Sequence, residues 1–355
     1  KLRAGSGITA TVNGASVTLD AATSAGGIDL THSSGTLTLD VPHSFSGLTL
    51  FGGTLTGTGA VTIPSSGVLN WSGGTIGGTG VLSTVSGSTT NLGANTALGA
   101  GRTWNNAGAV SFVPGGHNIS FDIAGTAVLN NQSGGVFDIH TAMINNGISG
   151  AGTINNAGEF KNTLNTTAQM TYVSPTFNNQ SGGVVNVNSS TLRFDRGGTD
   201  AGNYSVASGA TLQFNGGPRS ISGNVGGAGD VVLSGTGVAY TLAGDYNISG
   251  TTTATFGHNV VSSVDFTGTV SNLGTSYTQN GNLGTVTFPS SPGLGSLATL
   301  TMDYGTANFQ NGTTFPVLST LTRAGTGTLD LADASRSLTS LTVSGGTLTG
   351  TGTVT

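Results

Sequence analysis

Charged side chains are scarce in this chain of 355 residues, because lysine, arginine, aspartate and glutamate together make up only 6% of it. Soluble globular domains ordinarily contain about 25% charged residues, so the composition is unusual for a globular enzyme. The formal net charge is −5, and the nine basic residues form no cluster. A nucleic-acid-binding surface, which needs a basic patch, is therefore not expected.

Cysteine is absent, which excludes disulfides, thiol catalysis and cysteine-based metal sites. No run of 18 or more apolar residues occurs, so no membrane-spanning helix is expected. The chain begins at Lys1, without an initiator methionine and without a leader that combines charged, apolar and small residues. We therefore expect a processed chain or an excised piece of a longer one.

Glycine, in contrast, is abundant, with 62 residues. These glycines lack the every-third-residue period of collagen, and a hydrophobic content of 35% is too high for a disordered chain. The glycines are therefore interpreted as turn residues of a folded protein.

One short phrase is repeated four times in the middle of the chain. Each copy places a large apolar residue before Asn-Asn, followed by a glycine-containing turn and a β-prone run. The first asparagines of successive pairs are separated by about 23–25 residues, a period typical of a solenoid. The copies are WNNAGAV (104–110), LNNQSGGV (129–136), INNAGEF (154–160) and FNNQSGGV (177–184).

Helical coils of this length need alanine, leucine, glutamate and lysine, whereas this chain has one glutamate, two lysines and many Thr, Ser, Asn and Val residues. We therefore expect an all-β solenoid, in which a strand ends at the apolar residue and Asn-Asn with glycine forms the corner. Stacked coils would join the first asparagines by amide hydrogen bonds and would stack the preceding apolar residues inside. The predicted ladder is Asn105, Asn130, Asn155 and Asn178, and the predicted core stack is Trp104, Leu129, Ile154 and Phe177.

Short alternating strands are expected in the rest of the chain too. In GTLTLDV (35–41), Leu37 and Leu39 share one face while threonines occupy the other. GGTLTGTG (52–59) is followed one coil later by GGTIGGTG (73–80), so we expect coils of about 21–25 residues. Residues 1–355 are predicted to form a single continuous β-solenoid that is a fragment of a longer chain.

A longer repeat is indicated by the phrase GGTLTGTG, which first occurs at 52–59 and returns unchanged at 345–352. Residues 321–355 are therefore expected to restart a module of about 290 residues that is first seen from about residue 30. The alternative is that the phrase is a generic coil sequence in a low-complexity chain.

Four charged residues lie within the eight-residue segment RFDRGGTD (193–200). On one face of a β-coil such a group could bind an acidic sugar or Ca²⁺. The alternative is a solvated loop in which opposite charges offset one another. These weak ligand-binding candidates are Arg193, Asp195, Arg196 and Asp200.

Aromatic residues provide a second set of weak candidates. Tyr240 and Tyr246, which lie near Asp245, could bind carbohydrate. Trp71 and Trp104 could stack on sugar rings if they faced outward, but each lies at a strand end beside glycine or asparagine, which favours the core.

The remaining polar residues give no catalytic or metal-binding motif. The five histidines (His32, His43, His117, His140 and His258) lack the spacing of metal ligands, so no metal or cofactor is expected. Thr-x-Thr runs, for example at 54–56, could stack into the flat threonine face used by some ice-binding solenoids. The alternative is that threonine simply suits the outer face of a strand.

Three phrases, NNQSGGV, ISGAGTINNAGEF (148–160) and SGGTLTGTGTVT (344–355), resemble the repeats of bacterial surface β-helix proteins. These are the autotransporter passenger and filamentous-haemagglutinin-like adhesin group. The resemblance covers nearly the whole chain, but as a style of repeat, and it transfers no catalytic residues. It implies a right-handed parallel β-helix, export, and display at the bacterial cell surface for adhesion, aggregation or fibre building.

We therefore expect a non-enzymatic scaffold or adhesin at the cell surface or in the extracellular space. Expected partners are other copies or adjacent modules of the same protein, end to end, and glycans or proteins of host or neighbouring cells. Nucleic acid and membrane insertion are not expected. The alternative is a polysaccharide lyase or hydrolase on the same β-helix, and a minor alternative is an ice-binding β-solenoid.

Overall fold

The structure is a computed structural model that describes residues 8–19, 28–93, 95–116, 119–140, 146–163, 170–290, 292–310, 313, 318–332 and 339–351. These residues contain β-strands but no α-helix, and every recorded strand pairing is parallel. The fold is thus an all-β parallel solenoid, as predicted. Its contacts divide the chain into two compact units, unit 1 (Lys1–Val185) and unit 2 (Asn186–Thr355).

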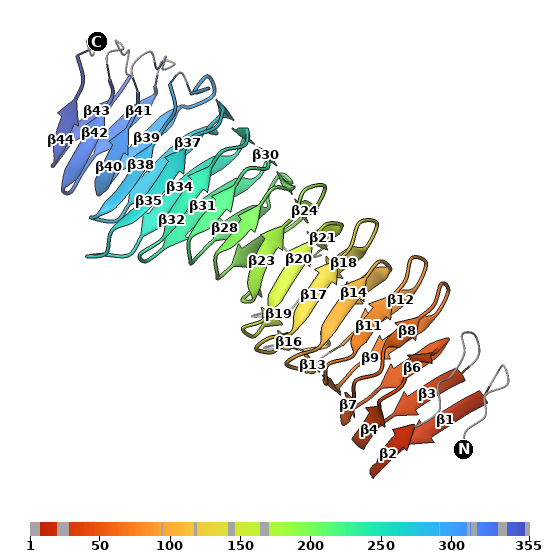
Figure 1. Cartoon of the computed structure of the whole chain (residues 1–355). Coiled ribbons are helices and arrows are strands. Elements are labelled where there is room, and N and C mark those ends of the chain that lie inside the picture. Colours follow the sequence, from red (N-terminus) through yellow and green to blue (C-terminus); the bar gives the residue numbers. More distant parts are fainter. Residues whose placement is uncertain are drawn as a thin grey trace. The chain divides into compact units, whose positions relative to one another are not determined.

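Unit 1 is built from three parallel sheets, A, B and C, which the chain visits in turn (Figure 1). Sheet A contains β1 (Ile8–Val12), β3 (Ile28–His32), β6 (Gly47–Leu50), β9 (Val68–Trp71), β12 (Thr89–Leu92), β15 (Ala109–Phe112), β18 (Val136–Ile139) and β21 (Glu159–Asn162). Sheet B contains β2 (Ala15–Leu19), β4 (Gly35–Leu39), β7 (Thr54–Thr56), β10 (Gly74–Ile76), β13 (Thr96–Leu98), β16 (Ser120–Ile123), β19 (Asn146–Ser149) and β22 (Met170–Val173). Sheet C contains β5 (His43–Ser44), β8 (Val61–Ile63), β11 (Val81–Thr84), β14 (Thr103–Asn106), β17 (Val128–Asn131), β20 (Thr153–Asn156) and β23 (Thr176–Asn179).

Unit 2 repeats this plan with sheets A′, B′ and D, and β24 (Val184–Val187) contains the boundary between the units. Sheet A′ contains β27 (Asn203–Val206), β30 (Val225–Gly227), β33 (Tyr246–Ile248) and β36 (Val270–Asn272). Sheet B′ contains β25 (Thr191–Phe194), β28 (Thr211–Phe214), β31 (Asp230–Gly235), β34 (Thr251–Phe256), β37 (Ser276–Asn280), β39 (Thr299–Met302), β41 (Thr320–Arg323) and β43 (Leu341–Val343). Sheet D contains β26 (Gly198–Asp200), β29 (Arg219–Ile221), β32 (Ala239–Leu242), β35 (Ser262–Phe266), β38 (Gly284–Thr287), β40 (Gly305–Asn308), β42 (Gly327–Asp330) and β44 (Thr347–Thr349).

Successive coils pair residue by residue, and their length varies. The pairing of Asp29 with Gly47 marks a short coil, and the pairing of Ala109 with Val136 marks a long one. Some coils are thus shorter and some longer than the predicted length of about 21–25 residues, which covers the middle of the distribution. Apart from a shift between Tyr246 and Asn247, where β33 pairs with β36, the strands keep their register because the connecting turns absorb the extra residues.

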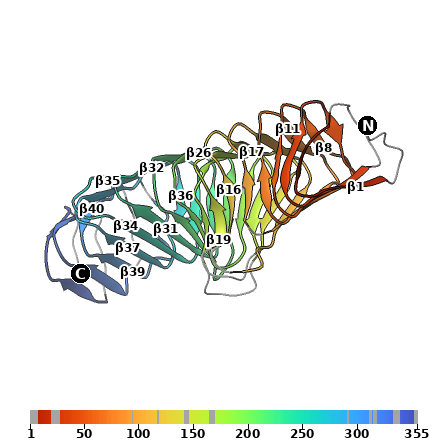
Figure 2. The same ribbon diagram turned by 90° about the horizontal axis from the view of Figure 1, so that it is seen from below.

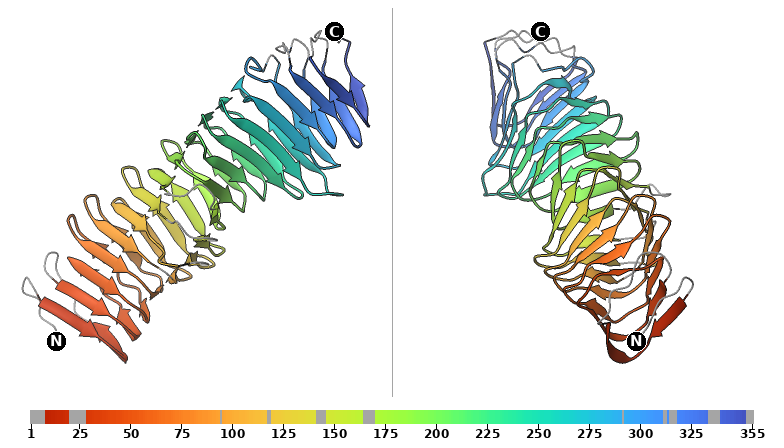
Figure 3. Two further views of the ribbon diagram at one scale, coloured as in Figure 1. Left: turned by 180° about the vertical axis from the view of Figure 1, so that it is seen from behind. Right: turned by 45° about the vertical axis from the view of Figure 1, so that its right-hand side comes forward.

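The interior of each unit follows from the alternation of buried and exposed side chains along most of its strands. In β17 and β20 of unit 1, and in β28 of unit 2, every second side chain is buried. Side chains of a strand alternate between its two faces, so one face supplies the core and the other faces solvent. Figure 2 shows β8, β11 and β17 of sheet C along one side of unit 1 and β19 of sheet B on another, and Figure 3 shows the stacked strands of each unit from two further directions.

The corners are formed differently from the sequence prediction. Both asparagines of each pair belong to the strand, as in β17, so the predicted corner at Asn-Asn is wrong. In the QSGG turns the first glycine has a positive φ, 82° at Gly134 and 83° at Gly182. A Cβ on the second glycine, Gly135, would lie 2.5 Å from the backbone oxygen of Asn106. The first glycine thus supplies the turn and the second allows two coils to approach closely.

Candidate functional site

The first asparagines of the four pairs form the predicted amide ladder along sheet C. Nδ2 of Asn130 donates to Oδ1 of Asn105 at 2.8 Å, and Nδ2 of Asn155 donates to Oδ1 of Asn130 at 2.9 Å. The third bond runs from Nδ2 of Asn178 to Oδ1 of Asn155 at 3.0 Å. These bonds are partly buried, and each amide donates to the preceding coil. The ladder prediction is confirmed, and we call this row of side chains the outer ladder.

The second asparagines form an inner ladder that was not predicted. Nδ2 of Asn106 donates to Oδ1 of Asn131 at 2.8 Å, and Nδ2 of Asn131 donates to Oδ1 of Asn156 at 2.8 Å. Asn156 donates in the same way to Asn179 at 2.9 Å, and the Thr84 hydroxyl donates to Oδ1 of Asn106 at 2.7 Å. All four amides are at most 1% exposed. Asn106, Asn131 and Asn156 each donate to the following coil, opposite to the outer ladder.

The inner ladder also ties the strand ends to the turns that follow them. Nδ2 of Asn131 donates to the backbone oxygen of Glu159 at 2.9 Å, and the backbone N–H of Gly108 donates to Oδ1 of Asn106 at 3.2 Å. Backbone groups next to a corner lose their regular partners, and a buried group without a partner is costly. The second asparagine therefore fixes both the coil spacing and the path of the turn.

The apolar residues before the asparagine pairs are stacked inside the coils of unit 1. They pair in register from β14 to β23, and each is 0% exposed. The indole of Trp104 lies 6.1 Å from that of Trp71, which is also 0% exposed. Both indole N–H groups have partners, the hydroxyl of Thr84 at 3.0 Å and the backbone oxygen of Gly74 at 3.3 Å. Neither tryptophan presents a ring to an external sugar. The stacked residues are Trp104, Leu129, Ile154 and Phe177.

The charged cluster in unit 2 does not form one site. Nε of Arg193 lies 2.6 Å from Oδ1 of Asp195 in a partly exposed ion pair, and the next coil adds the amide of Asn215, not a carboxylate, at 3.2 Å from Asp195. Arg196 is exposed. Asp200 lies on another strand, β26 of sheet D, and its side chain is buried. The prediction that these four residues share one binding face is therefore corrected.

Asp200 pairs with Arg219, a residue that the sequence analysis did not consider. Nη1 of Arg219 donates to Oδ2 of Asp200 at 2.5 Å, and both side chains are 0% exposed. The guanidinium lies 5.4 Å from the ring centre of Phe194 and 5.0 Å from that of Phe214. Burial by itself lowers the pKa of Arg219, but the charge of Asp200 leaves this pKa raised. The pair is a structural element of the core because no surface opens onto it.

The two tyrosine candidates also lie in the core. Tyr240 is 0% exposed and donates to the backbone oxygen of Ser234 at 2.6 Å, and Tyr246 is 1% exposed and lies 2.7 Å from the Thr252 hydroxyl. Burial raises the pKa of Tyr240 to about 12, partly offset by the charge of Arg219. The carbohydrate role predicted for these tyrosines is corrected, because no sugar ring can reach them. The alternation in AYTL, which places Tyr240 and Leu242 on one face, was the signal for burial.

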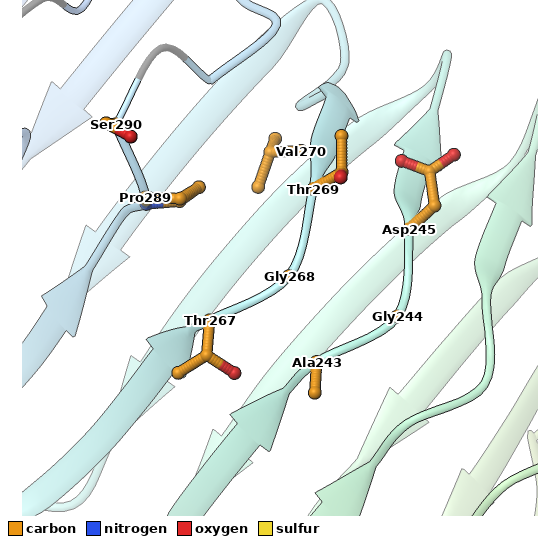
Figure 4. Close-up of a pocket in the computed structure, with 9 residues that line it drawn as sticks. All are labelled: Ala243, Gly244, Asp245, Thr267, Gly268, Thr269, Val270, Pro289 and Ser290. Atoms are coloured by element: carbon orange, nitrogen blue, oxygen red, sulfur yellow. The ribbon is translucent and has the colours of Figure 1, made fainter.

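An open groove lies on unit 2 at the turns that follow β32, β35 and β38 (Figure 4). Its volume is about 450 Å³. Oδ1 of Asp245 accepts a hydrogen bond of 2.6 Å from the Ser271 hydroxyl, and an adjoining groove of about 490 Å³ contains Asp265. The residues lining the first groove are Ala243, Gly244, Asp245, Thr267, Gly268, Thr269, Val270, Pro289 and Ser290.

Threonines form two columns on the outer face of sheet B′. One column has threonine in four successive coils, from β34 to β41, and the adjacent column has threonine or serine. Their register is maintained although the coils become shorter from β34 to β41. The columns are Thr253–Thr278–Thr301–Thr322 and Thr251–Ser276–Thr299–Thr320.

Histidines do not gather into a metal site in the described part of the chain, where no group of three or more His, Cys, Asp or Glu side chains could hold an ion. His32 and His43 are buried, Nδ1 of His140 lies 3.0 Å from the Thr163 hydroxyl, and His258 contacts the ring of Tyr304. His117 lies outside the described residues. Among the described residues, no helix is long and apolar enough to cross a membrane.

Comparisons with protein-family models, with curated proteins and with solved structures each give no match.

Proposed function

We propose that the protein is an extracellular structural scaffold with an adhesive role, displayed at a bacterial cell surface. The observation that carries this proposal is the pair of amide ladders, one partly buried and one fully buried, above the stacked apolar residues of unit 1. The asparagine pairs are the residues that recur most regularly in the sequence, and their side chains form hydrogen bonds from one coil to the next. Repetition of this kind favours a stiff support over a single reactive centre.

The mechanism would combine stiffness with multivalency. Interior polar side chains in unit 1 are fixed by neighbouring coils, so a contact surface on the outer strands keeps its geometry. Several weak contacts on one stiff support can add to a strong attachment without any single tight site. Suitable partners are other copies or adjacent modules of the same protein, end to end, and glycans or proteins on neighbouring or host cells.

Export and surface display are supported by the style of the repeats, which resembles adhesins of the autotransporter passenger and filamentous-haemagglutinin type, and by the lack of cysteine. The test is to raise antibody to this segment and probe surface-shaved, secreted and intracellular fractions of the source cells. We expect the antigen to be released by mild surface proteolysis. An antigen confined to the protease-shielded intracellular fraction would refute the proposal.

A polysaccharide hydrolase or lyase is the second candidate, and one observation favours it. The two grooves that contain Asp245 and Asp265 adjoin and share three lining residues. Glycoside hydrolysis commonly uses two carboxylates that flank the scissile bond. Reducing-end assays with neutral and acidic polysaccharides should distinguish the candidates: activity that Asp245→Asn and Asp265→Asn abolish would establish the enzyme, and no release of reducing ends is expected from a scaffold. The shared residues are Thr267, Pro289 and Ser290.

A further inference from the structure

A notch lies on the outer surface of unit 1, at the ends of four successive strands of sheet A. The residues that directly follow β6, β9, β12 and β15 belong to successive coils, as the backbone bonds between neighbouring coils show. The two outer positions carry large apolar side chains, with Phe51 62% and Val113 52% exposed. The two middle positions carry only Ser72 and Gly93. The result is an open pocket with an apolar wall at each end and a floor of small residues.

The dimensions of this notch follow from the coil spacing. Phe51 and Val113 lie three coils apart, or roughly 14 Å at about 4.8 Å per coil. The volume is about 450 Å³, within the range of small-ligand pockets. Trp71 and Leu92 lie beneath the floor and are buried, so the base is held by the packed core. The space fits one or two pyranose rings.

A row of polar side chains runs beside the notch on the same face of sheet A. Asn70 and Asn91 are exposed, and Nδ2 of Asn91 donates to Oδ1 of Asn70 at 2.8 Å. Thr49 and Ser111 extend the row in register on either side. Within the described part of the chain, Nδ2 of Asn70 and Oδ1 of Asn91 have no protein partner. This short ladder therefore leaves a donor and an acceptor free at the edge of the notch.

These groups together match a neutral sugar. The exposed ring of Phe51 suits the C–H face of a pyranose ring, because an aromatic face is weakly negative and a ring C–H is weakly positive. An amide that offers both a donor and an acceptor suits adjacent sugar hydroxyls, which also donate and accept. No residue lining the notch carries a charge, so nothing there compensates the desolvation of a carboxylate or sulfate.

We infer that this notch binds a neutral polysaccharide chain, with a pyranose ring stacked on Phe51 and its hydroxyls bonded to Asn70 and Asn91. The inference rests on the proposed adhesive scaffold in that it names the class of surface to which the scaffold attaches. A single notch would bind weakly, which is consistent with attachment through many copies.

The test is calorimetric titration of the full chain with cellohexaose, N-acetylchitohexaose and mannohexaose, and with polygalacturonate as the acidic comparison. We expect at least one neutral hexaose to bind. Phe51→Ala should weaken that binding by about tenfold or more and Asn91→Ala by about threefold to tenfold. Ser72→Leu, which fills the notch but keeps Phe51 and both amides, should abolish it.

Two matched controls lie on unit 2. Val261 is 73% exposed and lies far along the chain from the notch, so Val261→Ala tests the loss of an exposed apolar residue. Asn282 donates to Asn259 in an exposed amide pair at 3.1 Å, so Asn282→Ala tests the loss of such a pair. Both variants should bind the hexaose with unchanged affinity. Circular dichroism would verify that every variant retains its β structure.

Three results would overturn the inference: no binding of any neutral hexaose, equal losses in the notch variants and the controls, or a preference for polygalacturonate. Self-association that Phe51→Ala abolishes, in the absence of hexaose binding, would assign the notch to a second copy of the chain. If the protein is released by surface proteolysis but binds no sugar, the inference about the notch is refuted and the scaffold proposal stands. An antigen confined to the intracellular fraction would refute the scaffold proposal, whatever the result of the sugar titration.

Discussion

Replacing one asparagine of the inner ladder should cost far more stability than replacing its neighbour in the outer ladder. Asn131→Ala removes the amide that donates to Asn156 and accepts from Asn106, each at 2.8 Å, in a site where the side chain is 1% exposed. Water cannot replace these partners without entering the core. Oδ1 of Asn156 then loses its partner, and Nδ2 of Asn106 keeps only the longer bonds to the backbone oxygens of Gly108 at 3.3 Å and Val136 at 3.5 Å.

The magnitude follows from the number of buried groups affected. A buried polar group that loses its partner costs about 1–3 kcal/mol, so the two affected groups predict a loss of about 2–6 kcal/mol in the free energy of unfolding. Asn130→Ala also removes two side-chain hydrogen bonds, one donated to Asn105 and one accepted from Asn155. These bonds are partly buried, so water can take the place of the lost amide. That variant should lose only about 0.5–1.5 kcal/mol.

The assay is equilibrium unfolding in urea followed by tryptophan fluorescence. Both tryptophans of the chain, Trp71 and Trp104, are buried in unit 1, so the signal reports on the unit that contains the ladders. Trp104 pairs directly with Leu129 in the mutated coil. Equal losses for Asn131→Ala and Asn130→Ala, within about 0.5 kcal/mol at equal denaturant dependence, would refute the argument from burial.

Three further changes probe other features. Asp200→Ala should lower the free energy of unfolding by about 3–5 kcal/mol, because it leaves the charge of its buried partner Arg219 uncompensated. Asp195→Ala, which breaks a partly exposed ion pair, should lower it by less than about 1 kcal/mol. Hydrogen-exchange mass spectrometry of unit 2 would compare the stabilities of the two variants. His43 has a pKa lowered by burial, only partly offset by a backbone hydrogen bond. The neutral ring is therefore favoured in the folded state, so unit 1 should be most stable above pH 6.5 and should lose stability as the pH falls from 6.5 to the lower pKa of the folded state. Urea unfolding at pH 7.5 and at pH 5.0 should show this loss of stability. The variant His43→Phe should make the loss smaller. Gly135→Ala should destabilise unit 1 by about 1–3 kcal/mol, because the added Cβ would lie 2.5 Å from a backbone oxygen. Gly134→Ala should cost less, about 1 kcal/mol, because that Cβ meets open space and only the φ of 82° is unfavourable. Thermal unfolding would rank the two variants.

Much of the fold could be predicted from the sequence, because each coil of a solenoid repeats the same residue pattern at a nearly constant spacing. The spacing of the asparagine pairs predicted both the coil and the outer ladder, since stacked coils bring equivalent residues together. The second asparagine was misplaced because Asn and Gly were both assigned to the corner. Asparagine also tolerates an extended conformation, and once Asn106 continues the strand, alternation places it on the same face as Trp104.

The candidate sites were harder to predict, because proximity along the chain does not report the direction of a side chain. Arg193 and Asp200 lie seven residues apart, but Arg193 is in β25 of sheet B′ with a partly exposed side chain, whereas Asp200 is in β26 of sheet D with a buried one. The true partner of Asp200 lies 19 residues away, close to one coil length. A search for charges separated by one coil would have found Arg219. The length of the longer repeat and the prediction of a single continuous solenoid stay predictions.

The opposite donor directions of the two ladders have a consequence for the electric field of the stack. A row of aligned amides has a dipole that grows with every added member, and such a row polarises its own bonds. In unit 1 the outer amides donate toward the N-terminal coils and the inner amides toward the C-terminal coils. The two dipoles therefore oppose each other in every coil that carries Asn-Asn. A duplicated coil with both asparagines can therefore be added to such an array without increasing its net dipole.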